Sequence, residues 1–283
     1  MSDYEEQGLV FDCGDNRLVG ILSLPEEASD VGVLFLVGGP QYRVGSHRQF
    51  TLLARSLAEA GVASLRFDYE GMGDSEGTKR NFAETEGELF AAIEAFFENS
   101  PGLSRIILWG LCDGASTAMM YGHRFPQVAG MILLNPWVHS GEYSPGFKVS
   151  QYYRPLLAQR DQWGRLLRGQ VSPRPALRDL GKAVLSLLPG RRESAVPAPS
   201  SQSFVQEMQH GLARFKHDVL IILSEEDFTA KEFSTLIAGD NSWKESMRKP
   251  GATLHTIADA DHTFSKRIWQ DEVTQVTIDW VKS

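Results

Sequence analysis

The chain has 283 residues, of which 42% are hydrophobic and 23% charged, and this balance excludes a fibrous protein and a chain that is disordered throughout. A formal net charge of −8 at pH 7 argues against nucleic-acid and anionic-membrane partners, because a positive field holds both. The longest apolar run, VGVLFLV, is too short to cross a bilayer and the start MSDYEEQGLV lacks a basic, apolar signal, so we expect a cytoplasmic protein with a small-molecule or carrier-bound substrate.

The first predicted elements are strands. In GLVFDCGDNRLVGILSLP, two apolar segments flank the Gly-Asp-Asn sequence at 14–16, which tolerates the backbone angles of a tight turn and predicts a hairpin. The continuously apolar VGVLFLV predicts a strand covered on both faces. Ser46 with Gln49 three residues later is a capping-box pattern, so we expect a helix that starts there and ends at Gly61.

Strands and helices then alternate along the chain. The predicted strands are VASLRF, RIILWG, VAGMILLN, DVLIILS and ATLHTIA. The predicted helices span 82–98, 113–124, a stretch from about 229, and a C-terminal segment with Trp269, Val273, Val276 and Trp280 at helical spacing. This alternation implies right-handed crossovers and a mostly parallel sheet with helices on both faces.

Residues 138–217 interrupt this alternation. They contain Pro145, Pro155, Pro173, Pro175, Pro189, Pro197 and Pro199, with helical pieces such as SQYYRPLLAQRDQWGRLLRG between them. We interpret 138–217 as an inserted helical cap whose most mobile loop is PGRRESAVPAPSSQS, and 1–137 with 218–283 as one α/β core.

The segment GLCDG, at 110–114, joins a predicted strand to a predicted helix. G-x-C-x-G in this place is the cysteine form of the nucleophile elbow, a tight turn that lifts the nucleophile above the sheet. We expect side chains at 110 and 114 to clash with neighbouring backbone, and we expect the helix N-terminus to lower the pKa of a Cys112 thiol. The alternative is that Cys112 is an inert, buried thiol.

The partners of such a nucleophile follow later strands, in the order acid and then histidine. Glu225, Glu226 and Asp227 follow DVLIILS, and His262 follows ATLHTIA in ADADH. We predict His262 as the base and Asp227 as its acid, with Glu225 and Glu226 as competitors for the acid role. The structural alternatives are a loop histidine bonded to backbone and an Asp227 that caps the following helix.

Acyl transfer also needs hydrogen-bond donors for the oxyanion. The backbone N–H of Asp113, at the start of the helix, is the first expected donor. The second is expected in GGPQYRVG, and because Pro40 has no N–H we assign it to Gly39 or Gln41.

Several further side chains are candidate contacts of the substrate. The polar and aromatic candidates near the expected pocket are Arg43, His47, Trp137 and His139. The aromatic residues Tyr152, Tyr153 and Trp163 of the cap, with Trp137, either line the acyl pocket or only pack the cap on the core.

No cofactor or metal is expected from the motifs. FDYEGMGDSEGT lacks the lysine of a phosphate-binding loop and the full dinucleotide fingerprint, so we interpret it as a structural loop. Cys13 and Cys112 are the only cysteines and belong to no metal-ligand array, which favours two free thiols over a disulfide.

These motifs resemble the α/β-hydrolase superfamily across nearly the whole chain. More narrowly, the sequence resembles the exosortase A system-associated hydrolase type 1 family in GGPQYRVGSHRQF, GLCDGAS, NPWV, QYYRPLLAQRDQWGRLLRG, GLARF, TAKEF and DADHTFSKRIWQDEV. The resemblance implies a bacterial cytoplasmic hydrolase associated with exopolysaccharide and protein-sorting gene clusters, with Cys112, Asp227 and His262 at the catalytic positions. Dienelactone hydrolases also carry a Cys-His-Asp site, but their cap and loop sequences do not look similar to this chain.

We therefore expect a cysteine-dependent hydrolase that cleaves an ester or thioester through an acyl-enzyme. The alternatives are an acyltransferase or thioesterase of a biosynthetic pathway, and a catalytically idle binding protein with the same fold. Cysteine in place of serine, and GGPQ in place of a His-Gly loop start, separate this chain from most of the superfamily.

Overall fold

The structure is a computed structural model that describes residues 4–39, 41–138, 201–248 and 251–283, with the backbone alone at 201–203. The chain divides into two units, Met1–Val138 with Phe204–Ser283, and His139–Ser203. Nearly all of the second unit, with the helical pieces and the long loop expected of a cap, lies outside the described residues. The observed boundary at 203 precedes the expected one at 217, because Met208, Leu212 and Phe215 are buried in the core of the first unit.

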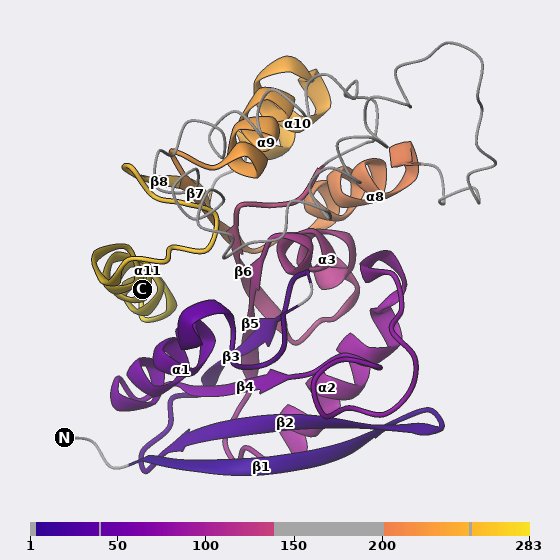
Figure 1. Ribbon diagram of the computed structural model, residues 1–283, viewed down its shortest axis with the longest axis vertical. Coiled ribbons are helices and arrows are strands. Elements are labelled where there is room, and N and C mark those ends of the chain that lie inside the picture. Colours follow the sequence, from indigo (N-terminus) through magenta and orange to yellow (C-terminus); the bar gives the residue numbers. More distant parts are fainter. Residues whose placement is uncertain (1–3, 40, 139–200, 249–250) are drawn as a thin grey trace, which may run out of the picture. The chain divides into compact units, whose positions relative to one another are not determined.

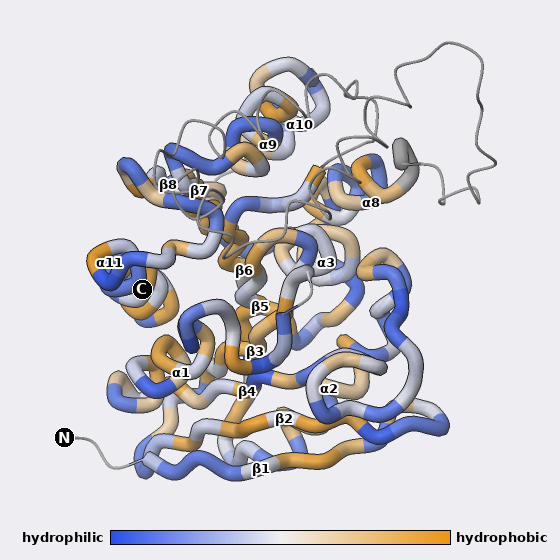
Figure 2. Tube along the Cα trace, in the orientation of Figure 1, coloured by the Kyte–Doolittle hydropathy of each residue, from blue (hydrophilic) through white to orange (hydrophobic). Residues whose placement is uncertain are grey.

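The first unit is built on an eight-stranded sheet with the order β1-β2-β4-β3-β5-β6-β7-β8. The strands are β1 Tyr4–Cys13, β2 Asn16–Pro25, β3 Val31–Leu36, β4 Ala63–Phe67, β5 Arg105–Leu111, β6 Val128–Leu134, β7 Asp218–Ser224 and β8 Ala252–Ile257. β1 and β2 form the predicted antiparallel hairpin, β2 is antiparallel to β4, and every other pair is parallel. The central strands are the most hydrophobic part of the trace (Figure 2), as the continuous apolar runs predict.

Helices cover both faces of the sheet (Figure 1). The α-helices are α1 Gln49–Glu59, α2 Glu86–Glu98, α3 Asp113–Tyr121, α8 Ser201–Arg214, α9 Phe228–Gly239, α10 Asn241–Met247 and α11 Arg267–Val281. α1 and α11 lie on one face, and α2, α3 and α8 lie on the other. Within the described parts of the chain, no helix has the length and apolar character needed to cross a bilayer.

An aromatic cluster holds the helices to the middle of the sheet. The rings of Phe35 on β3, Phe50 on α1 and Trp109 on β5 lie 5.3 to 6.0 Å apart and are almost wholly buried. The Trp109 indole N–H donates to Thr277 Oγ1 of α11 at 3.2 Å. β5, the strand that leads to Cys112, is therefore packed against two helices of the same face.

The expected capping box before α1 is wrong. His47 and Arg48 both have positive φ, 52° and 60°, and Arg48 is the N-cap without any side-chain capping bond. Ser46 lies in a short 3₁₀ turn, and its backbone N–H donates to the Gln41 side-chain oxygen at 3.0 Å. The helix end is as predicted, since Gly61 has φ +83° and its N–H donates to Ala58 O at 3.0 Å.

Candidate active site

Cys112 occupies a strained turn between β5 and α3. Its φ of 60° and ψ of −123° are unusual for a residue with a side chain, and it is the N-cap of α3. A Cβ at Gly110 would lie 2.5 Å from Gly114 backbone atoms, and a Cβ at Gly114 would lie 2.2 Å from Leu36 O. The clashes predicted at 110 and 114 are confirmed, and they explain why glycines surround the cysteine.

Backbone hydrogen bonds fix the turn that carries Cys112. The Cys112 N–H donates to Leu134 O at 2.9 Å, and Cys112 O accepts from the N–H groups of Ala115, Ser116 and Trp137 at 3.1, 3.2 and 3.3 Å. Cys112 is partly buried and is not in a disulfide. The turn is therefore bonded both to its own helix and to the segment after β6.

His262 and Asp227 come together as the sequence predicts. His262 Nδ1 lies 2.9 Å from Asp227 Oδ2, and the side chain of His262 is one-third exposed while that of Asp227 is 8% exposed. The same Asp227 oxygen accepts from Ala230 N at 3.0 Å, so Asp227 also caps α9. Asp227 thus contacts His262 and caps α9 at the same time, and its role as the catalytic acid stays a prediction.

The two competing carboxylates have other partners. Glu225 Oε2 accepts from the Asp259 N–H at 3.0 Å. Glu226 is exposed and forms an ion pair with Lys231 at 3.1 Å. Of the three acidic residues after β7, Asp227 is the one bonded to His262.

The charge state of His262 reflects its two neighbours. Burial lowers the pKa of His262, but the hydrogen bonds and charges of Asp227 and of Cys112 outweigh burial and raise this pKa to about 10. His262 thus bonds Asp227 through Nδ1, and Cys112 is the second group that raises its pKa.

A buried amide fixes the backbone of the histidine loop. Asn135, directly after β6, has no exposed surface and a positive φ of 44°. Its Nδ2 donates to His262 O at 3.0 Å and to Ser224 Oγ at 2.8 Å, and its Oδ1 accepts from Ser224 N at 2.8 Å. Ser224 Oγ in turn donates to Asp261 O at 2.8 Å. The sequence analysis did not single out this residue, although an asparagine directly after an apolar strand was a visible signal.

The two residues expected to supply the second oxyanion donor, Gly39 and Gln41, differ in the hydrogen bonds of their backbone N–H groups. The Gly39 N–H donates to Asp113 Oδ1, so it is engaged by a side chain. The Gln41 backbone N–H has no partner within the described parts of the chain. Burial raises the pKa of the Asp113 carboxyl, although the hydrogen bond from the Gly39 N–H opposes this effect.

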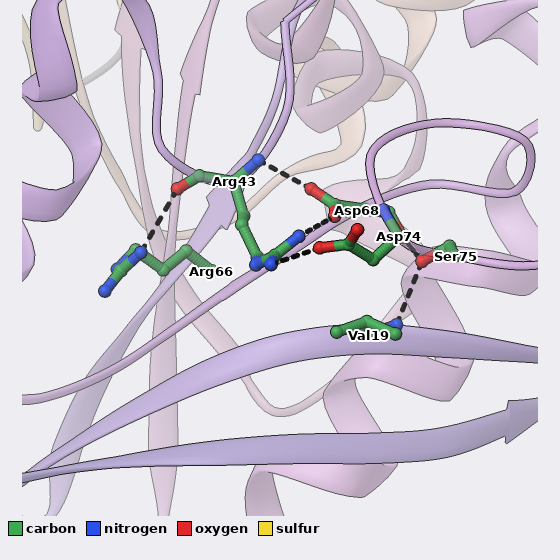
Figure 3. Close-up of polar contacts among 6 residues, drawn as sticks. All are labelled: Val19, Arg43, Arg66, Asp68, Asp74 and Ser75. Carbon is green, nitrogen blue, oxygen red and sulfur yellow. Dashed lines mark hydrogen bonds and ion pairs between the residues drawn. The ribbon is translucent and has the colours of Figure 1, made fainter.

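Arg43 contacts carboxylates rather than an open site. Its side chain points to Asp68 and Asp74 (Figure 3), pairing with Asp68 Oδ2 and lying 2.5 Å from Asp74 Oδ2. Its backbone N–H also donates to Asp68 Oδ1 at 2.6 Å, and Asp68 has no exposed surface. Arg43 thus joins the loop after β3 to FDYEGMGDSEGT, and the expectation that Arg43 contacts the substrate is corrected.

The glycine-rich loop is shaped around Asp68. A Cβ at Gly73 would lie 2.0 Å from Asp68 Oδ2, and Gly73 has φ +53°. Ser75 Oγ donates to Asp68 O at 2.7 Å and accepts from Val19 N of β2 at 2.9 Å (Figure 3). The interpretation of this segment as a structural loop agrees with these contacts.

The other candidates for substrate contact lie in different surroundings. His47 is exposed on the turn before α1, and Trp137 is partly buried with its N–H on Cys112 O. His139 and the cap aromatics Tyr152, Tyr153 and Trp163 fall outside the described residues. Within the described ranges, no group of three or more His, Cys, Asp or Glu side chains is arranged to hold a metal.

Comparison with known proteins adds a family and a fold. A family model described as Hydrolase_4, serine aminopeptidase S33, matches residues 43–264. The lysophosphatidylserine lipase ABHD12 of Danio rerio is 29% identical over 135 residues, which are 46% of this chain and 34% of that protein. The match thus spans about a third of the relative's length.

Solved structures share the architecture over nearly the whole chain. The Pyrococcus furiosus esterase Pf2001 has a TM-score of 0.66 at 17% identity, covering 99% of this chain and 92% of that one. The α/β hydrolase GrgF from Penicillium sp. sh18 has a TM-score of 0.62 at 19% identity, covering 98% of each chain. Est1E from Butyrivibrio proteoclasticus, solved with ferulic acid, has a TM-score of 0.61 at 15% identity, covering 96% and 97%. The predicted α/β-hydrolase fold is confirmed.

Proposed function

Since this chain belongs to the Hydrolase_4 family of α/β hydrolases, described as serine aminopeptidase S33, we propose that it cleaves an ester or thioester with Cys112 as the nucleophile. His262 is the base and Asp227 orients it. The observation that carries the proposal is the His262–Asp227 hydrogen bond of 2.9 Å, together with the strained turn that holds Cys112; Asp227 and Cys112 raise the pKa of His262 to about 10. The names of a zebrafish lipase and of an archaeal esterase among the similar proteins support an ester-like bond.

Cysteine replaces the serine after which the family is named. Cys112 is the residue at the elbow, and the serine nearest to it in sequence, Ser116, uses its hydroxyl to bond Cys112 O and Trp137 O at 3.3 and 2.7 Å. Ser116 has no exposed surface. The thiol is therefore the better nucleophile on both position and chemistry.

The reaction begins from a thiolate–imidazolium pair. The Cys112 thiolate attacks the carbonyl carbon, and the carbonyl electron pair moves to its oxygen. Collapse of this intermediate expels the alcohol or thiol, which takes its proton from His262, and leaves the acyl group on sulfur. Neutral His262 then takes a proton from water, the hydroxide attacks the thioester, and the acid and the thiolate are released.

Two backbone groups stabilise the oxyanion in this mechanism. The Asp113 N–H is at the helix start directly after Cys112, where the helix dipole also favours negative charge. Gln41 supplies the second N–H, because the Gly39 N–H is engaged by Asp113. Asp113 then acts through its side chain as a positioning residue for the loop that carries Gln41.

The finer assignment follows the resemblance to the exosortase A system-associated hydrolases. It favours a bacterial hydrolase of a small-molecule or carrier-bound acyl substrate. The alternative is a biosynthetic enzyme that passes the acyl group to an acceptor other than water. The free thiols of Cys13 and Cys112 favour the reducing cytoplasm. Metal and cofactor take no part in the proposed steps.

The test is intact-protein mass spectrometry after exposure to p-nitrophenyl esters and acyl thioesters. Wild type and Cys13→Ala should gain one acyl group, and Cys112→Ala should gain none. Adding an amine or alcohol and looking for its acylated form separates transfer from hydrolysis. Acylation that persists in Cys112→Ala would refute the assigned nucleophile, and no adduct or turnover with any substrate would favour an idle binding protein.

A further inference from the structure

A small pocket with a mixed polar and apolar lining lies beside the elbow, on the side of α2 and α3. Its volume is about 40 Å³, which is room for a few non-hydrogen atoms. Among the described residues, its lining includes Gly39 and the polar or charged residues Tyr69, Glu70, Lys79, Arg80, Thr85, Glu88, Asp113 and Thr117. Cys112, Asp227 and His262 do not line it, so it is separate from the reacting side chains.

Two residues that line this pocket each have a buried polar atom without a hydrogen-bond partner within the described part of the chain. These atoms are the hydroxyl oxygen of Tyr69 and Oε2 of Glu88, in residues that are 7% and 2% exposed. Glu88 Oε1 is satisfied, since it accepts from Glu70 N at 2.7 Å. A buried polar group without a partner costs about 1–3 kcal/mol, so both groups favour a molecule that can bond them.

The charges around the pocket have both signs and favour a neutral occupant over an ionic one. Glu70, Glu88 and Asp113 oppose a phosphate or a carboxylate, whereas Lys79 and Arg80 oppose an ammonium group. Arg80 lies 3.0 Å from Glu70, so these two charges compensate each other. A neutral group is the best match.

Of the neutral groups, a hydroxyl satisfies both unpartnered atoms at once. Burial, with the charge of Glu88, raises the pKa of Tyr69 well above its usual value, so the phenol remains a hydrogen-bond donor. A hydroxyl oxygen accepts from Tyr69, and its proton is donated to Glu88 Oε2. A plain methylene in the same place would leave both buried groups unsatisfied.

The position of the pocket indicates which part of the substrate enters it. Gly39 and Asp113 line the pocket, and the Asp113 N–H is the proposed oxyanion donor next to Cys112. We propose that this pocket binds a hydroxyl group on the acyl part of the substrate, with Tyr69 as donor and Glu88 as acceptor. This inference rests on the proposed acyl chemistry and adds the substrate class to it.

The experiment compares p-nitrophenyl butyrate with the two enantiomers of p-nitrophenyl 3-hydroxybutyrate. Wild type should give a kcat/KM roughly 10- to 100-fold higher for one hydroxylated enantiomer, as expected for one or two buried hydrogen bonds. Tyr69→Phe and Glu88→Gln should each bring that ratio towards one, and Gln keeps the oxygen that accepts from Glu70 N. Glu94→Gln, an exposed change on the same helix, is the matched control and should keep the wild-type ratio.

The outcomes separate this inference from the proposed function. Equal kcat/KM values for plain and hydroxylated esters in wild type would overturn the inference and leave ordered water as the occupant. If wild type cleaves neither ester, the proposed function fails for these substrates, and a binding measurement then tests the inference about the pocket. NMR titration with methyl 3-hydroxybutyrate and methyl butyrate should then show binding of the hydroxylated probe to wild type and not to Tyr69→Phe, and equal binding of the two probes would overturn the inference.

Discussion

The side-chain amide of Asn135 donates to the carbonyl oxygen of His262 at 3.0 Å, so a residue after β6 fixes the backbone of the proposed base after β8. Ser224, at the end of β7, joins the same set through its N–H and hydroxyl. Hydrogen bonds between three neighbouring strand ends thus set where the imidazole can lie. Fixed side chains of this kind reduce the reorganisation that a reaction would otherwise need.

Asn135→Gly should lower kcat about 10- to 100-fold, because a displaced imidazole loses its alignment with the thiol. Glycine tolerates the positive φ of 44° at this position, so the change removes the hydrogen bonds without adding backbone strain. The loss should be larger in kcat than in KM, and the His262 NMR signals should broaden or shift. Unchanged kinetics in a variant that is merely less stable to urea would limit Asn135 to a structural role.

The protonation of His262 should depend on Cys112. The ordinary histidine value of 6.5 is raised to about 10, with burial opposing this and Asp227 and Cys112 causing it. Since the folded-state pKa is above the unfolded one, the imidazolium stabilises the fold fully below about 6.5, and this stabilisation is lost as the pH rises to about 10.

Imidazole NMR over pH is the direct measurement. Wild-type His262 should titrate near 10, Cys112→Ala should titrate lower because the thiolate is gone, and kcat/KM should fall as His262 loses its proton. A wild-type midpoint near 6.5 would contradict the proposed ion pair.

The two free cysteines should differ strongly in reactivity. Burial, with the charges of Glu70 and Glu88, raises the pKa of Cys13 to about 11, whereas Cys112 has His262 as its neighbour. At pH 7, iodoacetamide should modify Cys112 roughly 100-fold faster than Cys13, measured by peptide mass spectrometry. His262→Ala should remove most of this difference, while comparable rates in wild type would favour an inert thiol.

Asp227→Asn tests the acid separately from the helix cap. Asparagine also caps helices well, so α9 should keep its stability, whereas kcat should fall by about 100- to 10,000-fold because the imidazolium loses its carboxylate. Asp227→Ala should lose a further ~1 kcal/mol of unfolding free energy with the cap. Glu226→Gln changes the exposed neighbouring carboxylate and should leave both quantities as they are.

The sequence predicted the features that depend on order along the chain. Apolar runs set the strands, and strands that end at one edge of a parallel sheet bring Asp227 into contact with His262. Of the three acidic residues that follow β7, the predicted Asp227 is the one that contacts His262.

The features that the sequence did not predict depend mainly on side-chain partners that are far away in the sequence. Arg43 looked free because Asp68 lies 25 positions later and is reached only after the loops fold together. The capping box failed because His47 and Arg48 take left-handed angles, which local propensity does not favour. The role of Asn135 requires a register between β6, β7 and the loop after β8 that no local pattern encodes.

The close packing of the glycines around Cys112 leads to a final prediction, which concerns the free energy of unfolding. A Cβ at Gly114 would lie 2.2 Å from Leu36 O, a backbone atom that cannot move without displacing β3. Gly114→Ala should therefore lower the unfolding free energy by about 2–4 kcal/mol and reduce activity together with it.

Gly87→Ala is the matched control, because nothing lies within 4 Å of a Cβ there and the residue is exposed in α2. It should raise the unfolding free energy by about 0.5–1 kcal/mol through helix propensity, and urea denaturation measures both variants. Equal effects of the two substitutions would mean that the close approach of α3 to β3 does not shape the elbow.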